Sequence, residues 1–310
     1  MTIHPGVIGI DVSKAHLDIF DVERGRPERL SNNAEVAHAL AQRLLSRAAG
    51  FAVFEATHPY DQLLRDAFMA QRVAFIRVNP QQARDFARAV GRRAKNDALD
   101  ARMLAAMSQV LTPAKSTPQD LRRKELALLH KRRDQLVETR AAEKVRLSEA
   151  GDISGSLESL IAWLSVEIAR FDRLIAELIA HDEAIGDDIR LLTSMPGVGP
   201  VTATTLVALM PELGTLSPAA AAALAGLAPF DRDSGRHRGV RRIEGGRRRV
   251  RRALYMAALT ASRSCPRFKR MLQNLYERGK PAKLALIAVA RKLLVTLNAI
   301  LRDRTAFRLA

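Results

Sequence analysis

The first third of the chain alternates largely apolar runs with amphipathic segments. The runs are short enough to predict buried strands, at 7–10, 17–20, 51–54 and 73–78. Segments with apolar residues at helical spacing follow at 34–47, 61–70, 81–90 and 97–110. The order strand–strand–helix–strand–helix–strand–helix predicts an α/β sheet with mixed strand order.

The middle of the chain has a different period. From 157 to 178 apolar residues recur in alternating steps of four and three, at Leu157, Ile161, Leu164, Ile168, Phe171, Ile175 and Leu178. Such a heptad repeat is typical of a coiled coil. A charged, helix-favouring stretch covers 119–149, and glycines at 151 and 155 separate the two segments. We expect an antiparallel helical hairpin, which packs either on itself or on another subunit.

The last third is mainly helical in pattern. It begins with 191–200, which includes Pro-Gly-Val-Gly, and a helix then runs through Met210. An Ala-rich helix spans about 218–225, and two helices follow near 247–263 and 281–301. A Gly- and Arg-rich loop covers about 229–246. The predicted organisation is therefore an α/β domain at 1–112, a hairpin at 113–188 and a mainly α domain at 189–310.

Charge separates these three parts. The chain carries 50 Lys and Arg against 33 Asp and Glu, a net charge of +17, and the part from 191 onward accounts for +16 of it. Arginine outnumbers lysine 40 to 10, which suits bidentate contacts to phosphate. A field of this sign favours polyanions, nucleic acid first and an anionic membrane surface second.

Cysteine content and hydropathy bear on location. The single cysteine, Cys265, excludes an intramolecular disulfide and suits a reducing cytoplasm. The sequence contains no uncharged apolar run of 18 residues and no signal-peptide pattern at its start. We therefore expect no membrane partner and a cytoplasmic protein.

Four carboxylates are candidate metal ligands. Asp11 and Glu55 each directly follow an apolar strand, and Asp97 and Asp100 are three residues apart in a helical stretch, which puts them on one helix face. Acids at strand ends can converge with such a pair on a divalent cation, because magnesium prefers hard oxygen ligands. Taken singly, an acid after a strand is more often a helix cap or a solvated turn residue.

Two features of the last third suggest phosphate chemistry. Gly197 and Gly199, in Pro-Gly-Val-Gly between helical segments, resemble the turn of a helix-hairpin-helix module, where backbone N–H groups can hold a phosphate. Ser234 lies between glycine and arginines, which can activate a hydroxyl and neutralise a phosphodiester. The arginines expected to bind nucleic acid are Arg232, Arg236, Arg238, Arg241, Arg242, Arg247 and Arg248.

Three sequence motifs resemble those of the DEDD transposases of bacterial insertion sequences, the Piv-like group. They are Gly9-Ile10-Asp11-Val12-Ser13-Lys14, Glu55-Ala56-Thr57 and Lys95-Asn96-Asp97-Ala98-Leu99-Asp100-Ala101. The resemblance implies a RuvC-like (ribonuclease-H-like) N-terminal domain whose four acids bind Mg²⁺ or Mn²⁺, here Asp11, Glu55, Asp97 and Asp100. The chain departs from the family pattern at His58 and Asn96, without losing a carboxylate.

The last third resembles the transposase domain of the same family. The similarity is carried by 226–252, by Leu254-Tyr255-Met256-Ala257-Ala258 and by 288–294. Together with the motifs of the first third, the resemblance to the family covers 7–105 and 190–302. It implies a recombinase in which Ser234 is the nucleophile and a dimer or tetramer joins the acid domain of one protomer to the serine domain of another. It also implies double-stranded DNA partners, the element ends and the target, and a noncoding bridge RNA as guide.

Two other hypotheses remain compatible with the residues. A metal-dependent junction nuclease would use the carboxylates alone and leave free DNA ends, with no role for Ser234. A non-catalytic nucleic-acid-binding protein would bind without magnesium and without the four acids.

Overall fold

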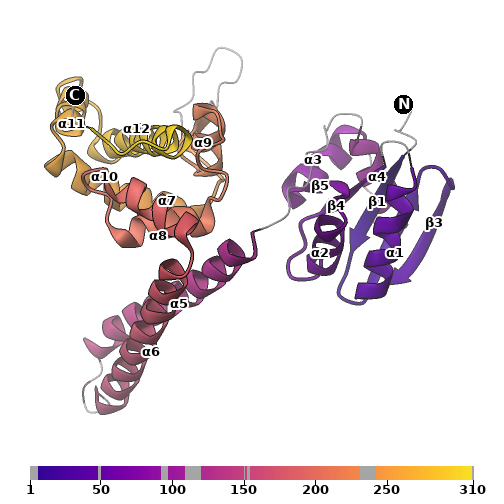
Figure 1. Cartoon of the computed structure of the whole chain (residues 1–310), viewed down its shortest axis with the longest axis horizontal. Coiled ribbons are helices and arrows are strands. Elements are labelled where there is room, and N and C mark those ends of the chain that lie inside the picture. Colours follow the sequence, from indigo (N-terminus) through magenta and orange to yellow (C-terminus); the bar gives the residue numbers. More distant parts are fainter. Residues whose placement is uncertain are drawn as a thin grey trace. The chain divides into compact units, whose positions relative to one another are not determined.

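The computed structural model describes residues 6–47, 50–91, 97–108, 120–149, 151, 154–230 and 242–308; at 97–99, 230 and 242 only the backbone is described. The chain divides into two compact units, Met1–Gln119 and Asp120–Ala310 (Figure 1). Each unit has its own hydrophobic core.

A five-stranded mixed sheet forms the centre of the first unit, in the order β3-β2-β1-β4-β5. Its strands are β1 (Val7–Val12), β2 (His16–Asp21), β3 (Arg26–Ser31), β4 (Phe51–Glu55) and β5 (Ala74–Val78). The β1–β2 and β2–β3 pairs are antiparallel, and the β1–β4 and β4–β5 pairs are parallel. The expected mixed α/β sheet is confirmed.

Strand β3 was not expected from the sequence. It reads Arg-Pro-Glu-Arg-Leu-Ser, and no residue in it is fully buried. An edge strand pairs on one side only and can be polar on both faces, so it carries no apolar run that would predict it.

Helices cover both faces of the sheet. Helices α1 (Ala34–Leu45) and α2 (Gln62–Ala70) share a core with Ile8, Ile10 and Ile19. Helices α3 (Pro80–Ala89) and α4 (Asp97–Met107) share a core with the alternate strand positions, Val7 and Val53 among them. Alternation along each strand therefore divides the unit into three layers, with α4 on the face that also holds positions 9 and 11.

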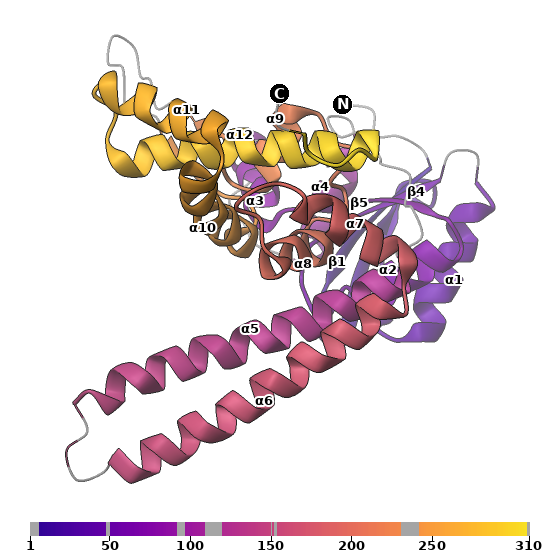
Figure 2. The same cartoon turned by 60° about the vertical axis from the view of Figure 1, so that its left-hand side comes forward.

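A long helical hairpin opens the second unit, made of α5 (Leu121–Leu147) and α6 (Ser154–Ala180) (Figure 2). Four positions of the heptad repeat are buried, at Leu164, Ile168, Ile175 and Leu178. Leu164 and Ile168 pack with Leu136 of α5. The repeat is thus used within the chain, and the outer side of α6 is a separate, solvent-exposed surface that includes Trp163.

Six further helices form the body of the second unit. They are α7 (Glu183–Thr193), α8 (Pro200–Leu209), α9 (Pro218–Leu224), α10 (Arg248–Ser264), α11 (Pro266–Glu277) and α12 (Ala282–Asp303). Leu126, Ile175 and Leu178 of the hairpin belong to the same core as these helices. Helix α11 was not expected from the sequence, because its six charged or amide side chains leave only a short apolar stripe that includes Phe268 and Leu272.

Helix α12 is long and apolar enough to cross a membrane by length and composition. Ten of its residues are buried, and most of these belong to the core of the unit. Arg291 and Lys292 interrupt it near its middle. Packing inside the unit accounts for its apolar character.

Candidate functional site

Asp11 and Glu55 meet at one edge of the sheet. Ile10 of β1 lies opposite Phe54 of β4 in a parallel pair, so the next residue on each strand is an acid. Side chains alternate along a strand, so both acids point to the face that α4 covers. Both are half-buried. The register therefore brings together two of the predicted metal ligands.

Gly9 allows α4 to lie directly on β1. A Cβ atom at position 9 would stand 2.0 Å from the carbonyl oxygen of Ala101 and 2.6 Å from the backbone nitrogen of Ala105. Both alanines are fully buried. The guanidinium of Arg102 lies 5.4 Å from the centre of the Phe20 ring on β2, which helps to fix the helix on this face.

The other two predicted ligands lie in the first turn of α4. The helix begins at Asp97, and Asp100 directly precedes the buried Ala101. Asp100 is half-buried, whereas the side chain of Asp97 lies outside the described residues, as does Asn96. Two strand-end acids and an acidic helix turn on one face offer the oxygen donors that Mg²⁺ prefers. Among described side chains, no group of three acids, histidines or cysteines is arranged around one ion position.

Two other acids of the first unit have arginine partners. Asp18 lies opposite Asp11 on β2 and is 8% exposed. Its two carboxylate oxygens accept hydrogen bonds of 2.8 and 2.9 Å from Arg29 of β3. Asp61 accepts a hydrogen bond of 2.5 Å from Arg77. Asp18 and Asp61 are therefore acids with a structural role in the first unit.

Asp21 shows how far such pairing goes. Its carboxylate is fully buried and accepts a 2.7 Å hydrogen bond from Arg47, with Arg43 at 3.7 Å. Burial raises the pKa of Asp21, but the hydrogen bond and charge of Arg47, the backbone hydrogen bond from Arg24 and the charge of Arg43 together hold the pKa below its ordinary value. Asp21 is therefore a charged structural group.

The segment around Ser234 is bracketed by a small hairpin. Strands β6 (Pro229–Phe230) and β7 (Arg242–Ile243) pair antiparallel, so residues 231–241 connect two adjacent strand ends. Ser234 and four of its neighbouring predicted phosphate ligands lie outside the described residues, namely Arg232, Arg236, Arg238 and Arg241; the side chain of Arg242 does too.

Two glycines and Arg251 join the base of this segment to α10. A Cβ at Gly246 would stand 2.2 Å from the backbone nitrogen of Gly226. The two backbone segments therefore approach this closely because position 246 has no side chain. Arg251 donates to the carbonyl oxygens of Gly226 and Gly245 over 3.2 and 2.7 Å. Sequence reasoning missed this anchoring role of Arg251, whose only signal was its place in an arginine run.

Arg247 and Arg248 differ in their surroundings. Arg247 donates two hydrogen bonds of 2.6 Å to Glu212 and one of 3.0 Å to the carbonyl oxygen of Leu209. Burial raises the pKa of Glu212, but the hydrogen bond from Arg247, a backbone hydrogen bond and the charge of Arg247 together outweigh it, so the pKa lies below its ordinary value. Arg248 is exposed on the first turn of α10. Arg247 thus has a partner inside the protein, and Arg248 faces solvent.

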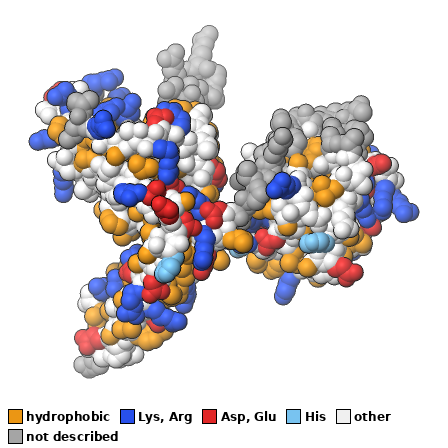
Figure 3. Space-filling view, viewed as in Figure 1, with side chains coloured by type: hydrophobic (Ala, Val, Ile, Leu, Met, Phe, Trp, Pro, Cys, Tyr) orange, Lys and Arg blue, Asp and Glu red, His pale blue; other side chains and the backbone are white. Residues whose placement is uncertain are grey.

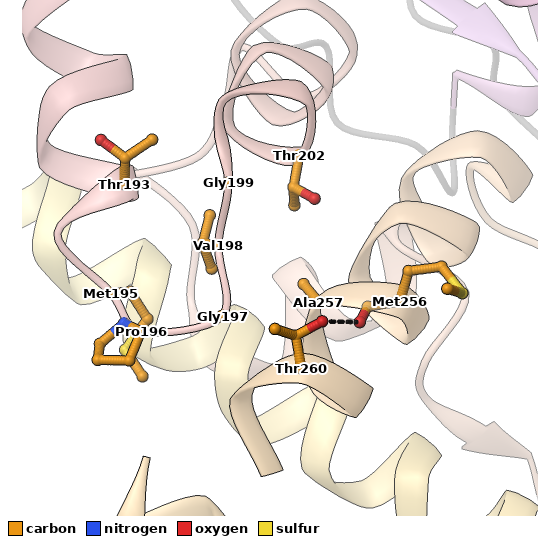
Figure 4. A pocket seen from close by; sticks show the side chains of 10 residues that line it. All are labelled: Thr193, Met195, Pro196, Gly197, Val198, Gly199, Thr202, Met256, Ala257 and Thr260. Atoms are coloured by element: carbon orange, nitrogen blue, oxygen red, sulfur yellow. Dashed lines mark hydrogen bonds between the residues drawn. The ribbon is translucent and has the colours of Figure 1, made fainter. Parts of the chain in front are cut away.

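The predicted glycine turn between α7 and α8 packs on α10. Gly197 has a φ of +93°, and a Cβ there would lie 2.4 Å from the backbone nitrogen of Ala261. Gly199 caps α8 and has open space around its Cα. An open groove of about 460 Å³ runs along the turn and is bordered on its other side by Met256, Ala257 and Thr260 of α10 (Figure 4). Close packing against α10 explains why position 197 is a glycine. Gly199 instead lies at the exposed start of α8.

Comparison with known proteins identifies both parts of the chain. Residues 8–150 match the family model of the DEDD transposase domain of IS110-type elements. Residues 189–273 match the transposase model of the IS116/IS110/IS902 family. These are the two domains of an insertion-sequence transposase. The chain is accordingly similar, in both of its parts, to transposases of the IS116/IS110/IS902 family with a DEDD domain.

Individual relatives match different shares of the chain. The pilin gene-inverting protein of Moraxella lacunata is 28% identical over 262 residues, 82% of this chain and 81% of the relative. An IS110 protein of 43.6 kDa from Streptomyces coelicolor is 38% identical over 120 residues, 38% of this chain and 29% of the relative. An IS900 protein of Mycobacterium paratuberculosis is 30% identical over 197 residues, 58% of this chain and 48% of the relative.

Proposed function

We propose that this protein is a site-specific DNA recombinase that cuts and rejoins DNA through Ser234, assisted by Asp11, Glu55, Asp97 and Asp100. The observation that supports this best is the pairing of Asp11 and Glu55 at neighbouring ends of β1 and β4, on the face where α4 begins. The relative named as a pilin gene-inverting protein favours rearrangement of a DNA segment as the reaction.

The four acids would hold Mg²⁺ or Mn²⁺. Asp11 and Glu55 lie on a sheet whose geometry is fixed by buried neighbours, and Gly9 sets the distance of the α4 turn from that sheet. When bound, the ion neutralises phosphate charge and orients the DNA backbone. The acids would therefore act by holding the ion beside the DNA backbone.

Ser234 would form a covalent bond to DNA. Its Oγ attacks a backbone phosphorus, an Oγ–P bond forms, and the bond from phosphorus to one sugar oxygen breaks. The serine proton is transferred through solvent to the departing sugar oxygen. Attack by a different sugar hydroxyl then reverses the step and seals the exchanged strand. The surrounding arginines neutralise the phosphate and the charge that develops on it.

Partner choice follows from the same proposal. Double-stranded DNA from the element ends and the target is the substrate, and a noncoding bridge RNA selects both. The acid domain of one protomer meets the serine domain of another in a dimer or tetramer. The +16 charge of the part from 191 onward supports polyanion binding.

A plasmid recombination assay with Mg²⁺ tests the reaction. We expect Ser234→Ala and Asp11→Ala each to abolish excision while leaving the folded protein intact by circular dichroism. Wild-type protein should give a protein–DNA adduct that survives denaturant and is lost in Ser234→Ala. Free DNA ends without an adduct would instead identify a junction nuclease. Binding without cleavage, unchanged by loss of the acids, would identify a non-catalytic protein.

A further inference from the structure

Helix α11 and its flanks carry a concentrated positive charge. Between 263 and 283 there are seven basic residues and one acid, Glu277. The basic residues are all exposed, at Arg263, Arg267, Lys269, Arg270, Arg278, Lys280 and Lys283. Lys and Arg side chains gather around the α11 end of the second unit in Figure 3. This segment lies apart from Ser234 in the sequence, and none of its residues was among the predicted ligands.

Three of these arginines line one groove. Arg267, Arg270 and Arg278 border an open groove of about 360 Å³ together with Asn274, and Met271 and Leu275 complete its lining. Successive polar lining residues are three or four apart, so they lie along one side of the helix. From 267 to 278 this row is about 16 Å long, which is the axial rise of about five base pairs.

The helix that presents the row is held firmly. Phe268 is fully buried in the core of the second unit, and Met271 and Leu272 pack against the same core. The arginine row therefore has a defined orientation, with its apolar neighbours turned inward.

Within the described part of the chain, these three arginines have no acidic partner. Other arginines of this unit do: Arg247 pairs with Glu212 and Arg252 with Glu138. The one acid nearby, Glu277, accepts a 3.3 Å hydrogen bond from Gln273 and does not line the groove. Like charges in a row repel one another, so an external anion would stabilise the row.

We propose that the α11 groove binds the phosphodiester backbone of duplex DNA as a second contact outside the Ser234 segment. Arginine forks and the Asn274 amide are suited to phosphate oxygens. The groove lining has no aromatic side chain on which an unpaired base could stack, which favours a duplex over a single strand. The choice of DNA rests on the proposed function, because a recombinase must hold duplex on both sides of its cutting point.

The test compares two full-length triple variants that lose the same charge. The groove variant is Arg267→Gln/Arg270→Gln/Arg278→Gln. The control is Arg146→Gln/Arg170→Gln/Arg190→Gln, whose arginines are exposed but paired with Glu143, Glu167 and Asp187. Binding of a labelled random-sequence 30-base-pair DNA is followed by fluorescence anisotropy from 50 to 200 mM NaCl. Duplex RNA of the same sequence and phosphatidylserine vesicles serve as parallel probes.

The slope of log affinity against log salt is negative, and loss of three phosphate contacts reduces its magnitude by about 2.7. The gain in affinity from 200 to 50 mM salt is then about 40-fold smaller in the groove variant than in wild type. The control should retain the wild-type slope. An unchanged slope in the groove variant, or an equal loss in the control, would overturn the proposal. A loss confined to duplex RNA or to vesicles would overturn the assignment to DNA.

The same measurement with Ser234→Ala separates this proposal from the catalytic one. Ser234→Ala should keep the full salt slope, because the α11 groove does not include the serine. If wild type forms no covalent adduct but the groove variant still loses slope, the recombinase mechanism fails and the DNA contact stands.

Discussion

The carbonyl oxygen of Ala101 in α4 lies only 2.0 Å from the point where a Cβ on Gly9 of β1 would stand. The sheet and the helix that carries two of the four acids therefore meet backbone to backbone. Asp11 lies two residues beyond Gly9 on the same face, and Asp100 directly precedes Ala101. This one contact determines how near the two pairs of acids can come.

Gly9→Ala should destabilise the first unit and abolish recombination. The added methyl would have to displace backbone, and such overpacking typically costs about 1–3 kcal/mol or more. Urea unfolding followed by circular dichroism measures the loss. Gly155→Ala is the control, because a Cβ at that position meets no atom within 4 Å and alanine favours the helix. A Gly9→Ala protein of wild-type stability and activity would contradict the close packing.

Asp11→Asn and Asp18→Asn should have different consequences, although the residues lie opposite each other on β1 and β2. Asp11→Asn should lose Mn²⁺ binding in isothermal titration calorimetry. Asp18→Asn breaks the pair with Arg29 and should cost about 1 kcal/mol, since that arginine is largely exposed. It should keep Mn²⁺ binding. Equal loss of binding in both variants would argue against a site at Asp11.

Arg247→Gln and Arg248→Gln form a second matched pair. Arg247→Gln leaves the carboxylate of Glu212 without its partner and should destabilise the second unit by about 1–3 kcal/mol. Arg248 is exposed, so Arg248→Gln should change stability by less than about 0.5 kcal/mol. It should instead weaken DNA binding and reduce its salt dependence. Urea unfolding and anisotropy separate the two effects. The reverse pattern would exclude this division of roles.

His130 should make the stability of the second unit depend on pH. It is 2% exposed, its Nε2 lies 3.0 Å from the hydroxyl oxygen of Thr205, and its Nδ1 has no hydrogen-bond partner among the described residues. That hydroxyl donates to the carbonyl oxygen of Val201, so it accepts from Nε2. Burial lowers the pKa of His130 from 6.5; Asp134 opposes this shift, and Arg133, Arg249 and Arg252 add to it.

The direction of this pH dependence follows from the lowered pKa of His130. Below pH 6.5 the unfolded chain takes up a proton that the folded protein does not, so stability falls as pH drops toward the folded pKa. The slope is at most about 1.4 kcal/mol per pH unit. Thermal unfolding between pH 5 and 8 measures it. His130→Gln should flatten this part of the curve, whereas the exposed His181→Gln should not. A wild-type slope in His130→Gln would assign the effect to another group.

Local pattern predicted much of the fold. Four strands of the first unit were expected because their apolar runs are long enough to fill a sheet interior, and the heptad of 157–178 predicted a helix that packs along one side. Strand β3 and helix α11 were missed, since one is a polar edge strand and the other a charged helix with a short apolar stripe. A short stretch of sequence does not show which strand a polar segment pairs with, or which face of a charged helix the rest of the fold buries.

The candidate site divides in the same way. The four acids, the serine and the arginines were predicted as site residues from residue type and order, because a sequence specifies which side chains carry charge or a hydroxyl. The identities of Asp11 and Asp18 are the same, however, and only strand pairing assigns Arg29 to the second. Arg247 and Arg248 are adjacent in the sequence, and only the position of Glu212 distinguishes them.

The sequence by itself determined the class of this protein, its charge distribution and the acids at its strand ends, since these depend on residue identity and short-range spacing. Tertiary structure alone decided that Asp11 and Glu55 lie side by side, that Gly9 admits α4, and that the heptad packs within the chain. The physical reason is that register, close packing and ion pairing join residues far apart in sequence, and each depends on which surfaces the fold buries together.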